Sequence, residues 1–141
     1  MKVGLYNGCF DCLHRGHIHA LIAARKQCDW LVLAVNSDES VKKLKGPSRP
    51  IETLETRLKA LRATNIAEAV VPFDGWIENF LVSLKPDIFF KGYDHDPRRN
   101  HGEGYTRGAC QVAGGIGCEI IVLPYLEGFS TSALVAGGQK G

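Results

Sequence analysis

The chain has 141 residues, of which 45% are hydrophobic and 23% are charged, and it carries a formal net charge of +2. This length fits one domain that buries enough surface to fold without disulfide bonds, and the near-average composition excludes a disordered or fibrous protein. The small net charge gives no support for a nucleic-acid partner, because nucleic-acid-binding domains usually carry a clustered basic stripe.

The start of the chain runs directly into Asn7 and Gly8 and leaves no room for the charged and apolar regions of a signal peptide. No apolar run approaches the roughly 18 residues that a membrane span requires. The five cysteines form an odd number, which favours free thiols over a disulfide framework. We therefore expect a cytoplasmic protein without a membrane partner.

The first part of the chain predicts a strand, a helix and a second strand. Residues 2–6 form a short β-prone apolar run, and residues 18–26 hold helix-forming residues without a breaker. The continuous apolar run at residues 30–35 is typical of a strand buried on both faces of a parallel sheet. Together these segments predict one βαβ unit.

The middle of the chain continues the alternation. Capping residues at 37–40 predict the start of a short helix, and a basic, Pro-containing loop follows at 46–50. Residues 53–63 show leucines at helical spacing and predict a second amphipathic helix. The next strand, residues 69–72, ends in a proline, which predicts a strand end or a sheet edge.

The last part of the chain predicts two further strands. The expected elements are a helix at 76–84, a strand at 88–90, a helix at 108–113, a strand at 119–123 and a short final helix capped by residues 130–132. The polar stretch at 96–107 gives no clear pattern, and residues 137–141 are expected to be a disordered tail.

This order of elements predicts an α/β fold, a Rossmann-like, doubly wound parallel sheet of five strands with right-handed crossovers. Ligands of such sheets bind at the carboxyl ends of the strands, near the point where the strand order reverses. We therefore expect functional residues directly after the strands.

The segment after the first strand carries the strongest chemical signal. His14 and His17 stand in an H-x-x-H spacing where a helix begins, and Gly16 between them lets a bulky ligand approach the backbone. A helix N-terminus presents unpaired N–H groups and the positive end of the helix dipole, which suits a polyphosphate. The two imidazoles can add hydrogen bonds to phosphate oxygens.

This segment resembles the signature G-x-F-D-x-x-H-x-G-H of the cytidylyltransferase-like nucleotidyltransferases. The fixed positions are matched by Gly8, Phe10, Asp11, His14, Gly16 and His17. Further blocks look like those of heptose 1-phosphate adenylyltransferases, the module found in ADP-heptose synthase. These blocks are residues 34–38, 44–46, 48–50, Arg57, 71–73, 91–94 and 127–132.

The resemblance implies an HxGH-type nucleotidyltransferase domain over residues 1–136. The implied reaction transfers AMP from ATP to a sugar phosphate such as heptose 1-phosphate by direct in-line attack and releases pyrophosphate. The expected setting is a surface-carbohydrate pathway such as lipopolysaccharide synthesis. The partners would be a nucleoside triphosphate, ATP rather than CTP, and a small phosphorylated acceptor. Magnesium would arrive with the triphosphate, and a homodimer is expected from the resemblance alone.

The resemblance also implies roles for individual residues. The catalytic candidates are His14, His17 and Lys45, which would stabilise the charge of the reacting phosphates. Arg57 matches an arginine near the acceptor site, and Ser130 and Thr131 match a hydroxyl pair that binds the β- and γ-phosphates. The full set of expected binding residues is Gly8, Cys9, Phe10, Asp11, Gly16, Lys43, Arg57, Lys91, Gly92, Asp94, Gly128, Ser130 and Thr131. No resident metal ligands are expected.

A second enzyme remains open at this stage, a CTP-dependent cytidylyltransferase that acts on glycerol 3-phosphate or a similar alcohol phosphate. Such enzymes resemble this chain at the first motif, but they carry an arginine where this chain has Tyr125. A third hypothesis is a non-catalytic nucleotide-binding module, or a metal-dithiol module. In the latter, Cys9 and Cys12 would act with the two histidines.

Purely structural roles are open for several of these residues. Asp11 could be the N-cap of the first helix. Lys43 and Lys45 could belong to a solvated helix face, and Ser130 to Ser132 could serve only as a helix cap.

Overall fold

The computed structural model describes residues 1–92 and 104–123. Within them the elements in chain order are β1 (Val3–Gly8), α1 (Arg15–Arg25), β2 (Trp30–Asn36), α2 (Asp38–Lys45), α3 (Leu54–Ala63), β3 (Ala69–Phe73), α4 (Ile77–Leu84), β4 (Ile88–Lys91), α5 (Gly104–Gly115) and β5 (Glu119–Val122). The helix expected after residue 130 and the tail expected at 137–141 lie outside the described residues.

The five strands form one sheet in the order β3-β2-β1-β4-β5, and each neighbouring pair is parallel. This result confirms the predicted five-stranded parallel α/β fold. The chain moves outward from β1 through β2 to β3 and then crosses to β4 on the other side of β1. The strand order therefore reverses between β1 and β4, and the carboxyl ends of these two strands meet at the switch point.

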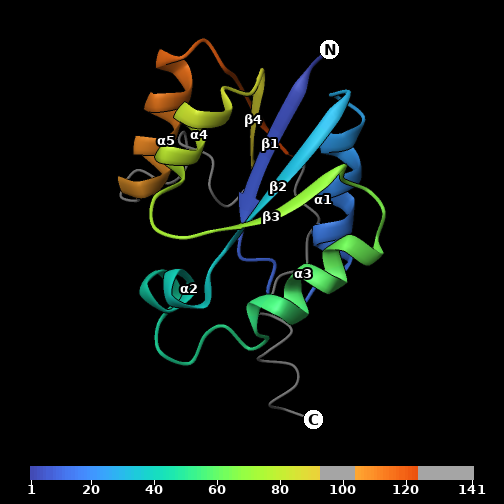
Figure 1. Cartoon of the computed structure of the whole chain (residues 1–141), viewed down its shortest axis with the longest axis vertical. Helices are drawn as coiled ribbons and strands as arrows, with labels where there is room; N and C mark the ends of the chain where they lie inside the picture. The colour runs from blue at the N-terminus through green and yellow to red at the C-terminus, as the bar shows by residue number, and fades with distance from the viewer. Residues whose placement is uncertain (93–103, 124–141) are drawn as a thin grey trace.

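Helices cover both faces of the sheet. One core contains side chains of α1 and α3, and the other contains side chains of α4 and α5; Figure 1 shows these two helix pairs on opposite sides of the strands. Along β2, Leu31, Leu33 and Val35 enter the first core, while Val32 and Ala34 enter the second. This alternation explains the continuous apolar run, because both faces of the strand are buried.

Two local features fit the sequence pattern. Strand β3, which contains Pro72, lies at the edge of the sheet as predicted. Gly4 lies where β1 passes β4, and a Cβ atom at this position would stand 2.5 Å from a ring carbon of Phe90. The absence of a side chain at Gly4 therefore allows the Phe90 ring to pack against β1.

Candidate active site

Helix α1 begins earlier than the predicted residue 18, because the two histidines cap it. The Nδ1 atom of His14, the N-cap residue, accepts a hydrogen bond from the Gly16 N–H at 3.0 Å. The Nδ1 atom of His17 accepts one from the His14 N–H at 3.2 Å. The imidazoles thus replace the Ser, Thr or Asp side chains that usually satisfy the first N–H groups of a helix.

This capping fixes the tautomer of both rings. A neutral imidazole whose Nδ1 accepts a hydrogen bond carries its proton on Nε2. The two rings are stacked with centroids 3.9 Å apart, so the Nε2–H groups of His14 and His17 are neighbouring donors. The Nε2 atom of His14 is buried, and within residues 1–92 and 104–123 it has no hydrogen-bonding partner. An unsatisfied donor at a helix N-terminus is suited to an anionic oxygen.

Burial keeps the two histidines neutral. Burial and the neighbouring His14 imidazole lower the pKa of His17 to about 4, although the Asp11 carboxylate acts in the opposite direction. Burial also lowers the pKa of His14. Near pH 7 both rings are therefore uncharged hydrogen-bond donors rather than fixed cations.

The loop between β1 and α1 is shaped by two residues in the left-handed region, Phe10 at φ 51° and Cys12 at φ 55°. The Phe10 ring is buried, and its edge-type contacts reach Tyr6 and His17 at centroid distances of 5.3 and 5.7 Å. Phe10 therefore positions the His17 ring from inside the core. Phe10 is 4% exposed, so the structure shows it acting on the site through its packing against His17, and its expected binding role stays a prediction.

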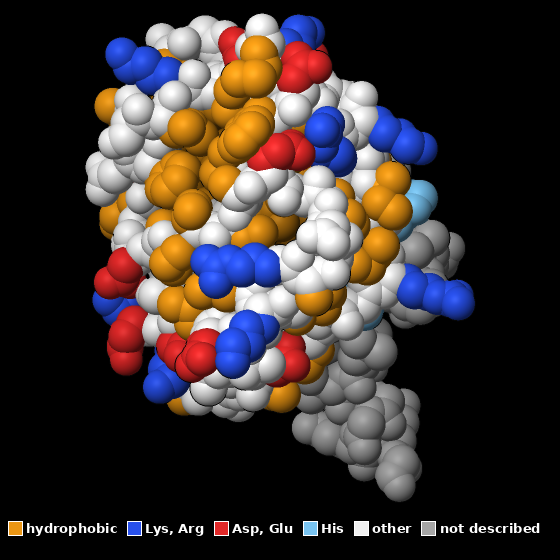
Figure 2. Space-filling view, turned by 45° about the vertical axis from the view of Figure 1, so that its right-hand side comes forward, with side chains coloured by type: hydrophobic (Ala, Val, Ile, Leu, Met, Phe, Trp, Pro, Cys, Tyr) orange, Lys and Arg blue, Asp and Glu red, His pale blue; other side chains and the backbone are white. Residues whose placement is uncertain are grey.

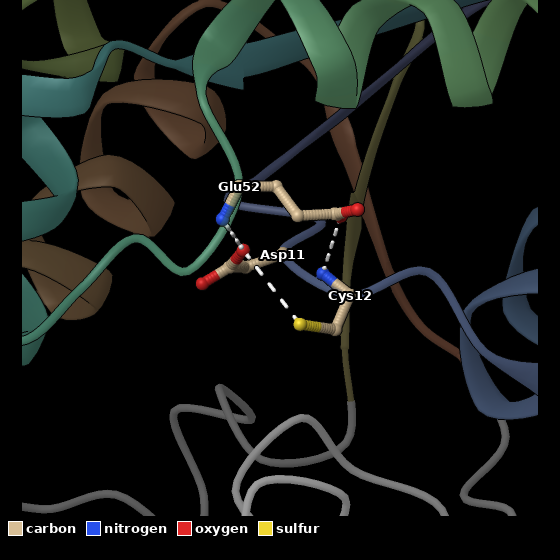
Figure 3. A group of neighbouring side chains, drawn as sticks. All are labelled: Asp11, Cys12 and Glu52. Carbon is tan, nitrogen blue, oxygen red and sulfur yellow. Dashed lines mark hydrogen bonds between the residues drawn. The ribbon is translucent and has the colours of Figure 1, made fainter.

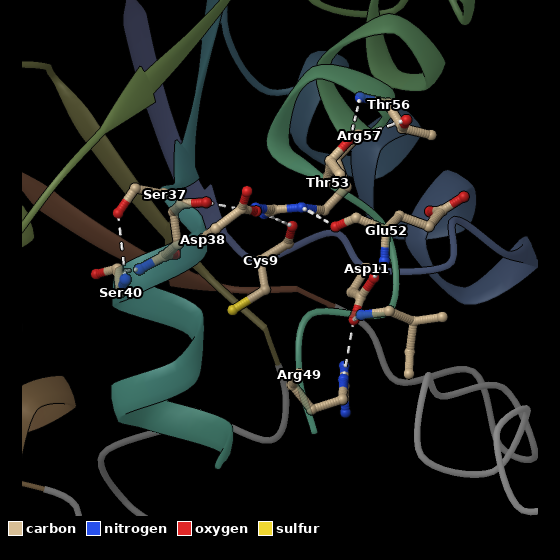
Figure 4. Close-up of polar contacts among 12 residues, drawn as sticks. Cys9, Asp11, Ser37, Asp38, Ser40, Arg49, Glu52, Thr53, Thr56 and Arg57 are labelled. Carbon is tan, nitrogen blue, oxygen red and sulfur yellow. Dashed lines mark hydrogen bonds and ion pairs between the residues drawn. The ribbon is translucent and has the colours of Figure 1, made fainter. Parts of the chain in front are cut away.

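Asp11 is not the N-cap of α1, as one interpretation of the sequence suggested. Its buried carboxylate points instead to the segment before α3, where it accepts hydrogen bonds from the Ile51 N–H at 2.7 Å and the Glu52 N–H at 2.9 Å. It also forms an ion pair of 2.9 Å with the Nε atom of Arg49 (Figure 4). Asp11 thus fastens the histidine loop to residues 49–52.

The acidity of Asp11 follows from these contacts. Burial alone would raise the pKa of Asp11, but the N–H groups of Ile51 and Glu52 and the Arg49 guanidinium together hold it below its ordinary value. A carboxyl group whose folded-state pKa is lowered stabilises the fold above its unfolded pKa, and this contribution is lost as the pH falls through the folded-state pKa.

We expect Asp11→Asn to lower the free energy of unfolding at pH 7 by about 2–3 kcal/mol, because charge-assisted hydrogen bonds are lost. Chemical unfolding of both proteins from pH 7 to pH 2.5 should show the difference shrinking below about pH 4. Asp29→Asn, which changes an exposed carboxylate that accepts a hydrogen bond from the Lys2 N–H, is the control and should have a smaller effect. A difference that stays constant over this pH range would contradict the assignment.

One possible metal site is found in residues 1–92 and 104–123. It consists of Asp11, Cys12 and Glu52, whose potential ligand atoms all lie within 4.8 Å of one another (Figure 3). Hydrogen bonds already use these carboxylates, since Glu52 accepts from the Cys12 N–H at 2.9 Å. Burial raises the pKa of both Cys9 and Cys12, which disfavours the thiolate that a metal needs. These observations disfavour the metal-dithiol hypothesis.

Arg57 differs from the expectation of a residue near the acceptor. Its side chain is fully buried, and its guanidinium joins four segments of the protein (Figure 4). It donates to the carbonyls of Cys9 at 2.8 Å, Asn36 at 2.8 Å and Glu52 at 3.1 Å, and it pairs with Asp38 at 2.8 Å. The fork of guanidinium N–H groups therefore holds the ends of β1 and β2 together and leaves no surface for a ligand.

Lys43 and Lys45 lie on α2, which extends through Lys45, and the loop begins only at Gly46. Both lysines are exposed, so they form the solvated helix face that the sequence left open. The Lys45 charge nevertheless lowers the pKa of Cys9 in opposition to burial, which puts Lys45 within electrostatic reach of the histidine loop. On the face of the protein drawn in Figure 2, acidic and basic side chains are scattered among many hydrophobic ones.

Lys91 lies at the end of β4 and is almost completely buried. Its Nζ atom donates to the Oδ1 atom of Asn7 at 3.2 Å and stands 5.0 Å from the centroid of the Phe89 ring. Because Asn7 belongs to β1, this contact spans the switch point. Gly8 and Gly92 directly follow Asn7 and Lys91, so these expected binding residues also lie at the carboxyl edge.

The remaining expected site residues, Asp94, Gly128, Ser130 and Thr131, lie outside the described residues. The sequence interpretation gave no site role to Asn7 or Glu52, and it included Arg49 only within the block 48–50 that carries the resemblance. Asn7 carried one usable signal, because it is a polar residue at the predicted end of a strand. Arg49 and Glu52 act through contacts across about 40 positions, for which the sequence pattern offers no sign.

The fold and the paired donors at its switch point define a Rossmann-like protein that binds an anionic ligand. Residues 5–134 match the family model described as cytidylyltransferase-like, and the chain belongs to this family. The family match confirms the predicted enzyme class, a nucleotidyltransferase. None of the helices in the described ranges combines the length and the hydropathy needed to cross a bilayer.

Curated relatives match all or nearly all of the chain. It is 39% identical over 145 residues to the bifunctional protein HldE of Hyphomonas neptunium, with 100% of this chain and 28% of the relative covered. The bifunctional protein HldE of Hydrogenovibrio crunogenus is 44% identical over 135 residues, with 95% and 27% covered. The chain thus spans little more than a quarter of the length of these relatives.

Solved structures support the fold. The lipopolysaccharide core biosynthesis protein from Thermoplasma volcanium superposes with a TM-score of 0.74 at 26% identity, covering 90% of this chain and 99% of that one. Pantothenate synthetase from Thermus thermophilus gives a TM-score of 0.65 at 16% identity, with 96% and 61% covered. The second likeness concerns the fold alone.

Proposed function

We propose that this protein transfers AMP from ATP to a sugar phosphate, with heptose 1-phosphate as the leading acceptor, and releases pyrophosphate. The observation that carries the proposal is the pair of neutral, stacked histidines whose Nε2–H groups stand together at the N-terminus of α1. The identity of 39–44% to the bifunctional HldE proteins over nearly the whole chain supports the choice of nucleotide and acceptor.

The proposed reaction has one chemical step. A phosphate oxygen of the acceptor attacks the α-phosphorus of ATP in line, and the bond from the α-phosphorus to the bridging oxygen of the β-phosphate breaks as the new bond forms. Pyrophosphate leaves with the bonding electron pair. Such a reaction depends mainly on positioning and on stabilising charge on the phosphoryl oxygens.

The chain's residues would divide this work. His14 and His17 would donate hydrogen bonds from Nε2 to oxygens of the reacting phosphates, without losing a proton of their own. Lys45, aided by Lys43, would bring a mobile positive charge to the triphosphate from the exposed end of α2. The hydroxyls of Ser130 and Thr131 are proposed to bind the β- and γ-phosphates.

We propose that magnesium enters as part of the substrate, as Mg·ATP. The acidic group nearest the histidine loop does not suit a resident ion, since the Asp11 oxygens already accept two backbone N–H groups and the Arg49 side chain. A cytoplasmic homodimer is proposed from the resemblance. The five cysteines are free thiols, which fits a reducing compartment.

The test is a matrix of ATP and CTP against heptose 1-phosphate and glycerol 3-phosphate, with pyrophosphate release as the measure and mass spectrometry of the sugar nucleotide as proof of product. We expect turnover with ATP and heptose 1-phosphate. Strict dependence on CTP with glycerol 3-phosphate would overturn the proposal in favour of a cytidylyltransferase. Retained turnover in a Cys9→Ser, Cys12→Ser double variant would exclude the metal-dithiol module.

A further inference from the structure

Glu78 lies at the edge of the sheet where ligands of this fold bind. Strand β3 ends at Phe73 and α4 begins at Ile77, so the first turn of α4, which contains Glu78, lies at the carboxyl edge. Helix α4 packs with α5 on the face opposite to α1. Glu78 and the histidine pair therefore approach the carboxyl edge from opposite faces of the sheet.

The carboxylate of Glu78 is incompletely satisfied. Its Oε1 atom is buried and has no hydrogen-bonding partner among the residues that the structure describes. A Cβ atom at Gly108 of α5 would stand 3.8 Å from Oε1, so α5 brings a residue without a side chain next to this oxygen at position 108. The residue as a whole is half-buried, and rotation about the Cγ–Cδ bond can exchange the buried Oε1 with the other carboxylate oxygen.

An unpartnered carboxylate oxygen is costly for folding, because its lost hydration is not replaced. Burial raises the pKa of Glu78, while its own backbone N–H and the positive charge of Lys91 act in the opposite direction. Lys91 is thus within electrostatic reach of Glu78, and Lys91 in turn contacts Asn7 across the switch point. A cation, an amide and a carboxylate stand close to one binding edge.

The chemistry of this group selects a ligand. A carboxylate accepts hydrogen bonds and repels phosphate, so its partner is a hydroxyl or another neutral donor. A sugar phosphate offers both kinds of group, an anionic end suited to the lysine and the histidines, and hydroxyls suited to the carboxylate. The contacts within the folded protein leave this carboxylate oxygen unpartnered. A hydrogen bond from a bound hydroxyl would offset the cost of that unpartnered oxygen.

We propose that the carboxylate of Glu78 accepts a hydrogen bond from a hydroxyl of a bound sugar and thereby determines specificity for a hydroxyl-rich substrate. This inference rests on the proposed function, in which two sugars are present, the ribose of the nucleotide and the sugar of the acceptor. Glu78 is a specificity residue in this scheme, and the phosphoryl chemistry proceeds without it.

The first test is Glu78→Gln, which keeps the shape and removes the charge. We expect the KM for the substrate whose hydroxyl is bound to rise by about tenfold or more, with kcat within about threefold of the wild type. We expect the melting temperature to stay equal or rise, because the charge is removed from a side chain whose buried Oε1 atom is unpartnered. Glu55→Gln, at an exposed carboxylate paired with Lys59 on α3, is the matched control and should change neither constant.

The constant that changes, KM for the sugar phosphate or Kd for ATP, shows which of the two sugars supplies the hydroxyl. A higher KM for the sugar phosphate alone identifies the acceptor. A weaker Kd for ATP in calorimetry, together with an equal loss when the wild type binds 2′-deoxy-ATP or 3′-deoxy-ATP, identifies the ribose. Both results support the proposal. Unchanged constants for both substrates, or a lower melting temperature with an equal loss of kcat, would overturn it.

Gly108→Ala provides a second variant on a different helix. The added methyl group would contact Oε1 at 3.8 Å without a clash, and alanine favours a helix over glycine. We expect the same KM to rise while the melting temperature is kept. If the wild type turns over no sugar phosphate, the proposed function fails. The role of Glu78 is then still tested by calorimetry, which compares the Kd values of the wild type and Glu78→Gln for ATP and for sugar phosphates.

Discussion

Replacement of His17 by alanine is expected to lower kcat for nucleotidyl transfer by about two to three decades, which corresponds to roughly 3–4 kcal/mol of lost transition-state stabilisation. The reason is the loss of one Nε2–H donor and of the contact that holds the neighbouring ring, 3.9 Å away. Steady-state kinetics with saturating ATP and acceptor measure the effect, and His19→Ala, at an exposed position of the same helix, is the control.

The two histidines should also behave as one unit. Since the His17 Nδ1 accepts from the His14 N–H and the rings stack, each ring orients the other. The His14→Ala, His17→Ala double variant is therefore expected to lose much less than the sum of the two single losses in ΔΔG‡. Full additivity, or a His17→Ala enzyme with wild-type kcat, would contradict the proposed role of the pair.

Arg57→Met is expected to lower the free energy of unfolding by about 3–5 kcal/mol. The methionine fills part of the volume but leaves the carbonyls of Cys9, Asn36 and Glu52 without their donor and Asp38 without its partner. Removal of one side of a buried charged network has effects of this size. Urea unfolding followed by circular dichroism measures the change.

Two further variants of α3 sharpen this test. Arg57→Lys should recover only a small part of the loss, because an ammonium group cannot reproduce the planar fork that contacts several carbonyls. Arg62→Met removes an exposed arginine that donates to the Val70 carbonyl, and it should cost no more than about 1.5 kcal/mol. Similar losses for Arg57→Met and Arg62→Met would show that the Arg57 network contributes little.

The sequence predicted the architecture well, because the order of apolar and polar residues within one segment reflects which faces of that segment are buried. The run at residues 30–35 was typical of a strand covered on both faces, and the proline in β3 indicated a strand end or an edge. The start of α1 was predicted three residues late, since histidine is not among the usual capping residues. Apolar periodicity alone begins at Ile18.

The details of the site depend on contacts that no local pattern records. Asp11 looked like a helix cap, but the left-handed turns at Phe10 and Cys12 direct its carboxylate to residues 49–52. Arg57 looked like a ligand-binding cation, but its partners are mostly backbone carbonyls. Since every residue has a carbonyl, a sequence carries no sign that a particular one will be a partner.

The choice of main-chain partners by Arg57 has an evolutionary consequence. Its bonds to residues 9, 36 and 52 go to main-chain oxygens, so substitutions at those positions keep the bonds as long as the backbone path is kept. The side chains around the binding edge can therefore change during evolution, and the substrate can change with them. The arginine would still hold the backbone at the ends of β1 and β2 in the same geometry.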